Sequence, residues 1–254
     1  NSDDDGLSDA SPGASAGMTG SSGTSGAGGS RPPGGGSGGG GASGGSPGGA
    51  GTSGESGASG SGSVGDREVV RSSGCGSAPE LESGYQTLEV DGVERTFIVD
   101  LPSDYDEDTA YPLLFGFHGR GFSGDEFRSA SYGNLLSVAA GDAIVVHPDA
   151  LGEDERAWET ESERDISFFD AMLEELADGL CVDQARVFAA GHSSGGYFIN
   201  LLGCERGDEL RAIAPVAGGG PFGSGGGAPS CSGPVSAWVA HSEDDETVLF
   251  SNGE

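Results

Sequence analysis

Two periodicities of apolar residues in the second part of the chain predict alternating strands and helices. Residues 85–91 and 94–101 alternate polar and apolar side chains on either side of Asp91-Gly92, which is typical of a β-hairpin. Short continuous apolar runs predict buried strands, and apolar residues three or four positions apart predict helices. The strands are expected at 112–117, 143–147, 186–190, 211–217 and 234–241, and the helices at 126–140, 165–180 and 194–204.

Strands that alternate with helices predict an α/β fold, with a mostly parallel sheet and helices on both of its faces. In such sheets the active residues gather at the carboxyl ends of the strands. Three of the expected strand ends carry polar residues. They are His118-Gly119-Arg120-Gly121, Gly191-His192-Ser193-Ser194-Gly195-Gly196 and His241-Ser242-Glu243-Asp244-Asp245.

Composition limits where this fold lies in the 254 residues. Residues 11–65 consist almost entirely of Gly, Ser, Ala, Pro and Thr. Because such a segment has little apolar surface to offset its ordering entropy, we expect a disordered linker. The expected organisation is an acidic tail at 1–10, the linker at 11–65 and one globular domain at 66–254. A long Gly/Ser stalk favours an exported or surface-tethered protein, and a chain that begins without Met is interpreted as a mature form or a fragment.

The net charge of −30 belongs mainly to the predicted domain. Of the 41 acidic and 11 basic residues, 36 and 10 follow residue 65, and every basic residue is Arg. Such a surface repels nucleic acid and anionic lipid, so neither is expected as a partner. No apolar run reaches the roughly 18 residues of a membrane span.

The sequence predicts no metal or other cofactor for the domain. The four cysteines form no CxxC or His-rich pattern, so zinc is not expected. Cys181 lies twelve residues before Ser193 and Cys204 eleven after it, so we expect both near the lower end of the sheet as a candidate disulfide. Cys75 and Cys231 stay unassigned. Residues 1–9 resemble the start of a calcium-binding loop, but Pro12 stands where its Glu is required, and a solvated acidic tail is the preferred interpretation.

The stretch 191–196 (GHSSGG) has the spacing of a nucleophile elbow. Glycines at 191 and 195 allow a sharp strand-to-helix turn with Ser193 exposed as the nucleophile. The backbone N–H groups of Ser194 and Arg120 are then the expected oxyanion-hole donors. Asp245, after a later strand, is the expected acid that orients the base.

From about Gly74 onward the chain resembles secreted polyhydroxybutyrate depolymerases and feruloyl esterases of the α/β-hydrolase group. The matching segments are RTFIVDLP from Arg95, YPLLFGFHGRG from Tyr111, VHPD from Val146, GHSSGG from Gly191 and AIAPVAGG from Ala212. The resemblance implies an α/β-hydrolase fold and a secreted serine esterase. Its substrate would be a polyhydroxyalkanoate, a feruloyl or acetyl ester of xylan, or a smaller ester.

By motif, the resemblance implies Ser193 as the nucleophile and Asp245 as the triad acid. The family's His-Gly-Thr-x-Asp appears here as His241-Ser-Glu-Asp-Asp245, which leaves Asp244 as a second candidate for the acid. The catalytic histidine of such enzymes follows the acid in the chain, whereas this chain has no histidine after Asp245.

Each of the four histidines of the chain is therefore a candidate for the base. His192 adjoins the nucleophile, and its side chain is expected to point away. His118 is expected to brace the oxyanion loop, His147 ends a more distant strand, and His241 shares a strand end with the acid. The preferred hypothesis places the base beyond residue 254, in a domain that is incomplete at its C-terminus. Residues 66–254 alone are then expected to be nearly inactive.

Two other functions stay open at this point. One is a catalytically inactive hydrolase-fold module used for adhesion or binding on its flexible stalk. The other is a serine peptidase or acyltransferase with the same triad. The aromatic residues Trp158, Phe122 and Tyr197, near the expected mouth of the site, could either stack on a substrate or pack within the domain.

Overall fold

The computed structural model describes residues 68–130, 134–152, 156–221 and 230–250. The expected acidic tail at 1–10, with its resemblance to a calcium loop, and the linker at 11–65 lie outside these residues. Within the described part, seven strands form one sheet in the order β1-β2-β4-β3-β5-β6-β7. The pairs β1–β2 and β2–β4 are antiparallel, and the other four are parallel. This confirms the predicted α/β class and mostly parallel sheet.

The antiparallel edge of the sheet is the hairpin that the alternating pattern predicts. Strand β1 (Gly84–Val90) and strand β2 (Val93–Asp100) are joined by Asp91 and Gly92. Both turn residues have positive φ, 53° and 76°, as a two-residue type I′ turn requires. Strand β2 then pairs with the buried strand β4 (Ile144–Pro148) and so attaches the hairpin to the parallel part of the sheet.

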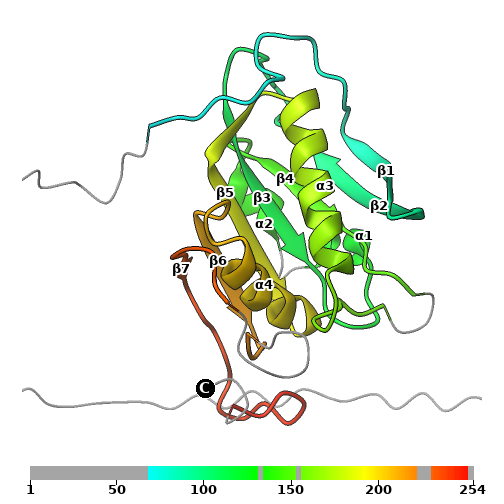
Figure 1. Cartoon of the computed structure of the whole chain (residues 1–254), viewed down its shortest axis with the longest axis vertical. Coiled ribbons are helices and arrows are strands. Elements are labelled where there is room, and N and C mark those ends of the chain that lie inside the picture. The colour runs from blue at the N-terminus through cyan, green and yellow to red at the C-terminus, as the bar shows by residue number, and fades with distance from the viewer. Residues whose placement is uncertain (1–67, 131–133, 153–155, 222–229, 251–254) are drawn as a thin grey trace, which may run out of the picture. The chain divides into compact units, whose positions relative to one another are not determined.

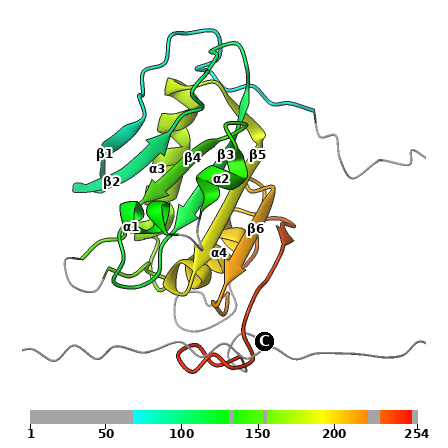
Figure 2. The same ribbon diagram turned by 180° about the vertical axis from the view of Figure 1, so that it is seen from behind.

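The parallel strands β3 (Tyr111–Phe117), β5 (Val182–His192) and β6 (Ala212–Val216) form the middle of the domain. Helices α3 (Arg164–Gly179) and α4 (Ser194–Glu205) cover the face turned to the viewer in Figure 1. The short helices α1 (Gly124–Ser129) and α2 (Leu135–Ala139) lie on the opposite face, seen in Figure 2. Phenylalanines fill much of the core between these layers; those fully buried are Phe97, Phe115, Phe117, Phe168, Phe169 and Phe198. No helix among the described residues is long and apolar enough to cross a membrane.

Two predicted elements differ from the structure. The single helix expected at 126–140 is replaced by the separate helices α1 and α2. Helix α2 has its own N-cap, because the Asn134 side chain accepts a hydrogen bond from the N–H of Ser137 at 3.1 Å, and a capping Asn favours a new start over helix continuation. The strand expected at 234–241 shortens to β7 (Ser236–Ala237), with one further bridge between Ala240 and Val216.

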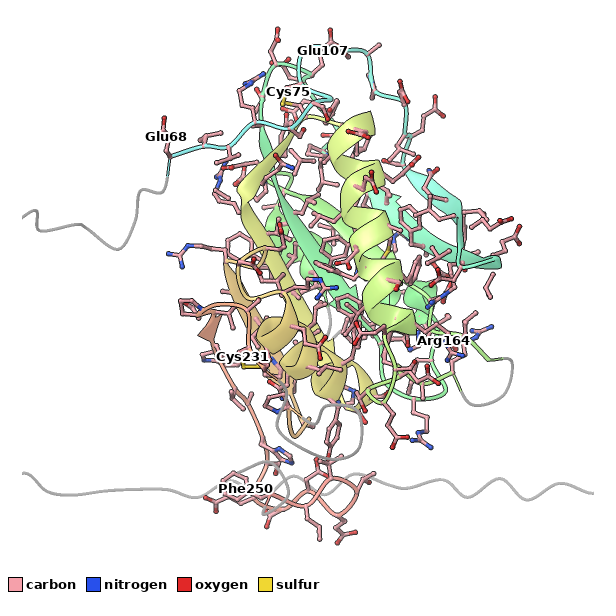
Figure 3. All side chains as sticks on the ribbon, in the orientation of Figure 1. Glu68, Cys75, Glu107, Arg164, Cys231 and Phe250 are labelled. Atoms are coloured by element: carbon pink, nitrogen blue, oxygen red, sulfur yellow. A yellow bond between two sulfur atoms is a disulfide. The ribbon has the colours of Figure 1, made fainter. Side chains whose placement is uncertain are left out.

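The predicted Cys181–Cys204 pair is wrong. The disulfides join Cys75 to Cys181 and Cys204 to Cys231, and Figure 3 shows Cys75 and Cys231 in well-separated parts of the domain. The reason lies in the different rise of a strand and a helix. The chain climbs roughly 35–40 Å between Cys181 and Ser193 in extended form, but descends only about 15 Å from there to Cys204 in α4. Cys204 therefore stops well short of the level of Cys181.

Candidate active site

Ser193 occupies a strained backbone position between β5 and α4. Its φ and ψ are 52° and −117°, far from the regions that non-glycine residues normally adopt. The N–H of Ser193 donates to the carbonyl oxygen of Val216 on the neighbouring strand β6 at 2.9 Å, and its own carbonyl accepts from the N–H of Tyr197 at 3.0 Å. These bonds hold the turn in place. A non-glycine residue strained in this way at a strand-to-helix turn has the backbone geometry of a nucleophile elbow.

Close backbone packing around the elbow explains its two flanking glycines. A Cβ on Gly195 would lie 2.2 Å from the carbonyl oxygen of Phe117, and a Cβ on Gly191 would lie 2.4 Å from the carbonyl oxygen of Gly195. Both distances are shorter than any side chain tolerates. The glycines therefore let α4 start directly against the carboxyl end of β3, where the loop from His118 to Gly121 begins.

This loop, called the oxyanion loop below after its expected role, lies beside Ser193. A Cβ on Gly119 would lie 3.5 Å from the Cβ of Ser193. The N–H of Gly121 donates to the carbonyl of Arg156 at 2.8 Å, and the N–H of Phe122 donates to that of Gly119 at 3.2 Å. Because these two amides already have acceptors within the protein, they are not available to a substrate.

The other expected oxyanion donor belongs to the start of α4. Ser194 is the first residue of this helix, and the first amide groups of a helix have no acceptor within it. The positive end of the helix dipole also lies here, and such a helix start is suited to stabilise negative charge on a carbonyl oxygen. The assignments of Ser194 and Arg120 as donors stay predictions. Ser194 directly follows Ser193, and Arg120 directly follows Gly119, the residue that packs against Ser193.

Trp158 is buried beneath the site and does not line its mouth. Only 5% of its surface is exposed. Its ring stacks on Phe198 at 5.3 Å between centroids and meets Phe117 edge-on at 4.9 Å. Its indole N–H donates to the carbonyl of His118 at 2.9 Å, and its backbone N–H donates to the Ser194 hydroxyl oxygen at 3.0 Å. Of the three aromatic residues proposed at the mouth, Phe122 is 41% exposed and can still meet a ligand there.

A buried ion pair that the sequence reading missed supports the Trp158 segment. Arg95 on β2 and Asp165 in the first turn of α3 are joined at 2.8 Å between Nη2 and Oδ1, and both side chains are almost fully buried. The second oxygen of Asp165 accepts the N–H of Glu159 at 2.6 Å. Burial lowers the pKa of Arg95, while the adjacent Asp165 raises it. A signal was present, since Arg95 shares the inward face of its strand with Phe97 and Val99, where a charge requires a partner.

The predicted triad acid lies in the turn after β7. Oδ1 of Asp245 accepts the N–H groups of Thr247 and Val248, each at 2.9 Å. These two bonds, with Val248 the stronger influence, lower the pKa of Asp245 and keep it ionised. Burial lowers the pKa of His192 in the elbow, and the charge of Asp245 raises it by a smaller amount. Asp244 is exposed and Asp245 half-buried, which favours Asp245 of the two candidates.

The hydrogen bonds of two histidines define their tautomers. His118 Nε2 accepts the N–H of Ala150 at 3.0 Å, so its proton is on Nδ1, which faces the carbonyl of Gly119 at 2.7 Å. Burial lowers the pKa of this ring. His118 therefore braces the oxyanion loop, as expected. His241 Nε2 lies 2.7 Å from the carbonyl of Val248 and so carries the proton; the same atom lies 3.6 Å from Asp245 Oδ2.

His147 lies deep in the sheet, away from the elbow. Its side chain is fully buried on β4, and its Nδ1 is 3.8 Å from Asp100 Oδ2. Burial lowers its pKa to about 4, with Asp100 acting in the opposite direction. His192, directly before Ser193, faces the oxyanion loop instead, because its Nδ1 would lie 3.2 Å from a Cβ on Gly119.

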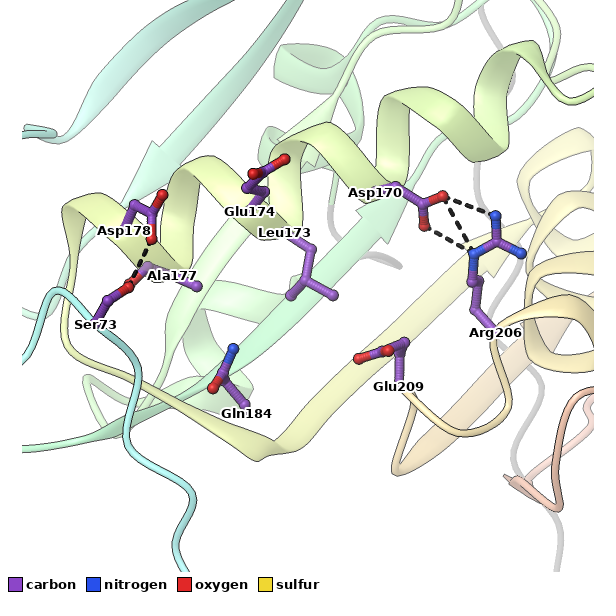
Figure 4. Close-up of a pocket in the computed structure, with 9 residues that line it drawn as sticks. All are labelled: Ser73, Asp170, Leu173, Glu174, Ala177, Asp178, Gln184, Arg206 and Glu209. Atoms are coloured by element: carbon purple, nitrogen blue, oxygen red, sulfur yellow. Dashed lines mark hydrogen bonds and ion pairs between the residues drawn. The ribbon is translucent and has the colours of Figure 1, made fainter.

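A hollow of about 650 Å³ lies between α3, the start of β5 and the segment that follows α4, as Figure 4 shows. Carboxylates dominate its lining, and Asp170 pairs there with Arg206 at 2.7 Å. None of its lining residues belongs to the elbow, the oxyanion loop or the Asp245 turn. We therefore do not assign the ester-binding site to this hollow. Among the described residues, no group of three or more His, Cys, Asp or Glu side chains is arranged to hold a metal ion.

The sequence is similar to curated feruloyl esterases. It is 35% identical over 187 residues to probable feruloyl esterase C of Aspergillus niger. This alignment covers 72% of this chain and 65% of that protein. It is 33% identical to feruloyl esterase D of Neurospora crassa, covering 72% and 64%, and 33% identical to probable feruloyl esterase C of Aspergillus terreus, covering 76% and 68%. The chain thus spans about two thirds of the length of these relatives. No family model matches the sequence.

Solved esterase structures share the fold. A thermostable esterase aligns with a TM-score of 0.51 and 22% identity, covering 66% of this chain and 48% of that one. A ferulic acid esterase from Anaeromyces mucronatus, solved in complex with ferulic acid, aligns with a TM-score of 0.51 and 19% identity, covering 66% and 74%. These similarities confirm the predicted hydrolase fold.

Proposed function

The chain belongs to the polyhydroxybutyrate depolymerase/feruloyl esterase family of α/β-hydrolases, and from this premise we propose that its domain is that of a serine carboxylic-ester hydrolase. Its substrates are plant-wall esters, with feruloyl esters of xylan preferred over acetyl esters and polyhydroxyalkanoates because the curated relatives are feruloyl esterases. The strained backbone of Ser193 carries the assignment to catalysis. Strained backbone conformations of this kind cluster at active sites.

The proposed reaction proceeds through an acyl-enzyme. The Ser193 hydroxyl oxygen attacks the ester carbonyl carbon while a histidine removes its proton, and the carbonyl oxygen becomes an oxyanion held by the N–H groups of Ser194 and Arg120. The alcohol leaves with the proton that the histidine returns. Water then attacks the acyl group by the same route, releasing the acid and restoring Ser193. Asp245 orients the histidine and stabilises its charged form.

The contacts of the histidines bear on which of them is the base. His118 uses both of its ring nitrogens within the protein, His147 is buried on β4, and the protonated nitrogen of His241 faces the Val248 carbonyl. His192 points toward the oxyanion loop. We propose that the base is a histidine other than these four, which keeps the hypothesis of a base beyond residue 254.

We further propose that the protein acts outside the cell. Two disulfides link distant parts of the described chain, and such bonds persist in oxidising compartments. Surface tethering through the Gly/Ser-rich residues 11–65 stays a prediction.

The test compares the full-length natural protein with its Ser193→Ala variant on methyl ferulate, p-nitrophenyl butyrate and polyhydroxybutyrate. We expect hydrolysis of methyl ferulate with the highest kcat/KM, and a loss of roughly 10⁵–10⁶-fold in kcat for Ser193→Ala. A wild-type protein that is folded but hydrolyses none of the three would contradict the proposal and favour the inactive binding module. Unchanged hydrolysis by Ser193→Ala would contradict the assigned nucleophile.

A further inference from the structure

One short segment, residues 156–159, forms hydrogen bonds with both arms of the expected oxyanion hole. The loop arm is held twice, since the Gly121 N–H donates to the Arg156 carbonyl at 2.8 Å and the Trp158 indole N–H donates to the His118 carbonyl at 2.9 Å. The helix arm is held once, because the backbone N–H of Trp158 donates to the Ser194 hydroxyl oxygen at 3.0 Å. The two arms come from different elements, β3 and α4, so their separation depends on what joins them.

We propose that Trp158 is a positioning residue that sets the distance between the two oxyanion donors, Ser194 on one arm and Arg120 on the other. The inference rests on the proposed function and deepens it. The backbone N–H of Trp158 donates to the helix arm, and its indole N–H donates to the loop arm. Its ring is fixed between Phe117 of β3 and Phe198 of α4, so neither donor group of Trp158 can move without displacing the core.

The buried pair Arg95–Asp165 anchors this segment to the rest of the domain. Asp165 accepts the N–H of Glu159 with one oxygen and binds Arg95 with the other, and Arg95 Nη2 also lies 3.2 Å from the carbonyl of Asp149. The Arg95 guanidinium rests on the Phe168 ring at 3.9 Å. Paired charges in a buried setting have little freedom to rearrange, because a broken pair leaves an uncompensated charge. The anchor therefore transmits the rigidity of β2 and α3 to Trp158.

The geometry also explains why a tryptophan is needed. Phenylalanine could fill the space between Phe117 and Phe198 but has no donor for the His118 carbonyl. A buried carbonyl that loses its donor moves to find another partner, and that movement displaces the adjacent loop at Gly119 and Arg120. Stabilisation of an oxyanion falls steeply when its donors leave their positions, with losses of roughly 10²–10³ for removal of one donor.

The test compares Trp158→Phe with Trp238→Phe in the full-length natural protein. Trp238 is 66% exposed and directly follows β7, the strand at one edge of the sheet, so it is a matched control for the same change. We expect Trp158→Phe to lower kcat on p-nitrophenyl butyrate by roughly 10–100-fold, part of a full donor loss, with KM within about twofold because the ground-state ester does not use the donors fully. Trp238→Phe should leave both constants unchanged.

Ser194→Ala provides a second variant if Trp158→Phe folds poorly. It removes only the acceptor of the Trp158 backbone N–H and keeps the Ser194 amide; we expect a smaller loss of kcat, roughly 3–10-fold, again with KM unchanged. Thermal unfolding measured on each variant gives the folded fraction at the assay temperature. Values of kcat that equal the wild type, or that fall only as far as the folded fraction does, would overturn the inference.

Ser193→Ala, assayed in parallel, separates the two proposals. If Ser193→Ala abolishes hydrolysis while Trp158→Phe and Ser194→Ala leave kcat intact, the positioning role is wrong and the esterase stands. If hydrolysis does not depend on Ser193, the esterase assignment itself fails, and the positioning role fails with it.

Discussion

The two tryptophans of the chain lie in unlike regions, Trp158 within the candidate site and Trp238 outside it. Trp158 is 5% exposed and lies under the elbow, where it bonds to both the oxyanion loop and α4. Trp238 is 66% exposed and directly follows β7, in the segment of the chain that continues to Asp245. The half of the site that contains the expected oxyanion donors comprises the loop 118–121, the start of α4 and Trp158. This oxyanion half is held by buried aromatic packing and by hydrogen bonds between segments distant in the sequence. The acid half is held mainly by local bonds, such as those from Thr247 and Val248 to Asp245.

The difference indicates where the domain is preorganised. Oxyanion donors act only if they are fixed before the reaction, because reorganisation during the reaction cancels their benefit. The carboxylate acts through a histidine and needs only the correct charge and direction. We infer that changes in the oxyanion half affect folding and rate together, whereas changes in the acid half affect mainly the rate.

Among the variants that test this comparison, Asp245→Asn has the largest expected effect. Its side chain keeps the shape of the carboxylate but loses the charge that stabilises a histidinium, so kcat of the full-length natural protein should fall by roughly 10⁴. The free energy of unfolding from urea titration should change little. Asp244→Asn is the matched control on the exposed neighbour and should retain full activity. The reverse result, with Asp244→Asn the inactive variant, would move the acid to Asp244.

Removal of each disulfide tests the same division between stability and rate, with smaller expected effects than Asp245→Asn. Cys75–Cys181 closes a loop of 106 residues and Cys204–Cys231 one of 27, so loop entropy predicts stabilisation of about 4–5 and about 3–4 kcal/mol respectively. The first lies at the amino end of β5, and the second ties α4 to the connection toward β7. Replacing the first pair by Ala should cost more stability in urea titration. Replacing the second should lower kcat of the folded protein by more, and equal effects on kcat would contradict the division into halves.

The smallest expected effect is on the pH dependence of stability, through the buried side chain of His147. Burial lowers the pKa of His147 from its ordinary value of 6.5 to about 4 in the folded protein. Between pH 6.5 and 4 the unfolded chain therefore binds a proton that the native state does not, and stability falls as the pH falls. Between pH 7 and 4.5 this contributes about 2–3 kcal/mol. In His147→Leu this part of the pH dependence should disappear from urea titrations. A variant with the full wild-type pH dependence would show that other groups, such as His118, are responsible.

Local patterns were sufficient to predict most of the fold and the elbow. The Asp91-Gly92 hairpin and the alternation of strands with helices were readable because each depends on neighbouring residues. The position of Ser193 between a strand and a helix was readable for the same reason. Asn134 is a residue type that often caps helices, but the prediction of one helix at 126–140 did not use it.

Features that depend on distant contacts were not readable in this way. The pairing of Cys181 required the relative lengths of β5 and α4, and an estimate of helix rise against strand rise would have corrected it. The position of Trp158 required knowing that the segment 156–159 contacts His118 after β3 and Ser194 at the start of α4. Arg95 gave a partial signal, as a charge on an inward strand position, but its partner Asp165 lies 70 residues later in the sequence.

The most direct test of the account is the covalent state of Ser193 during turnover. The full-length natural protein is mixed with p-nitrophenyl butyrate, quenched in acid within milliseconds, digested and analysed by mass spectrometry. The account predicts a butyryl group on the hydroxyl of Ser193 during turnover, and none in Ser193→Ala. Ester hydrolysis with no acyl group on Ser193, or with an acyl group on a different residue, would contradict it.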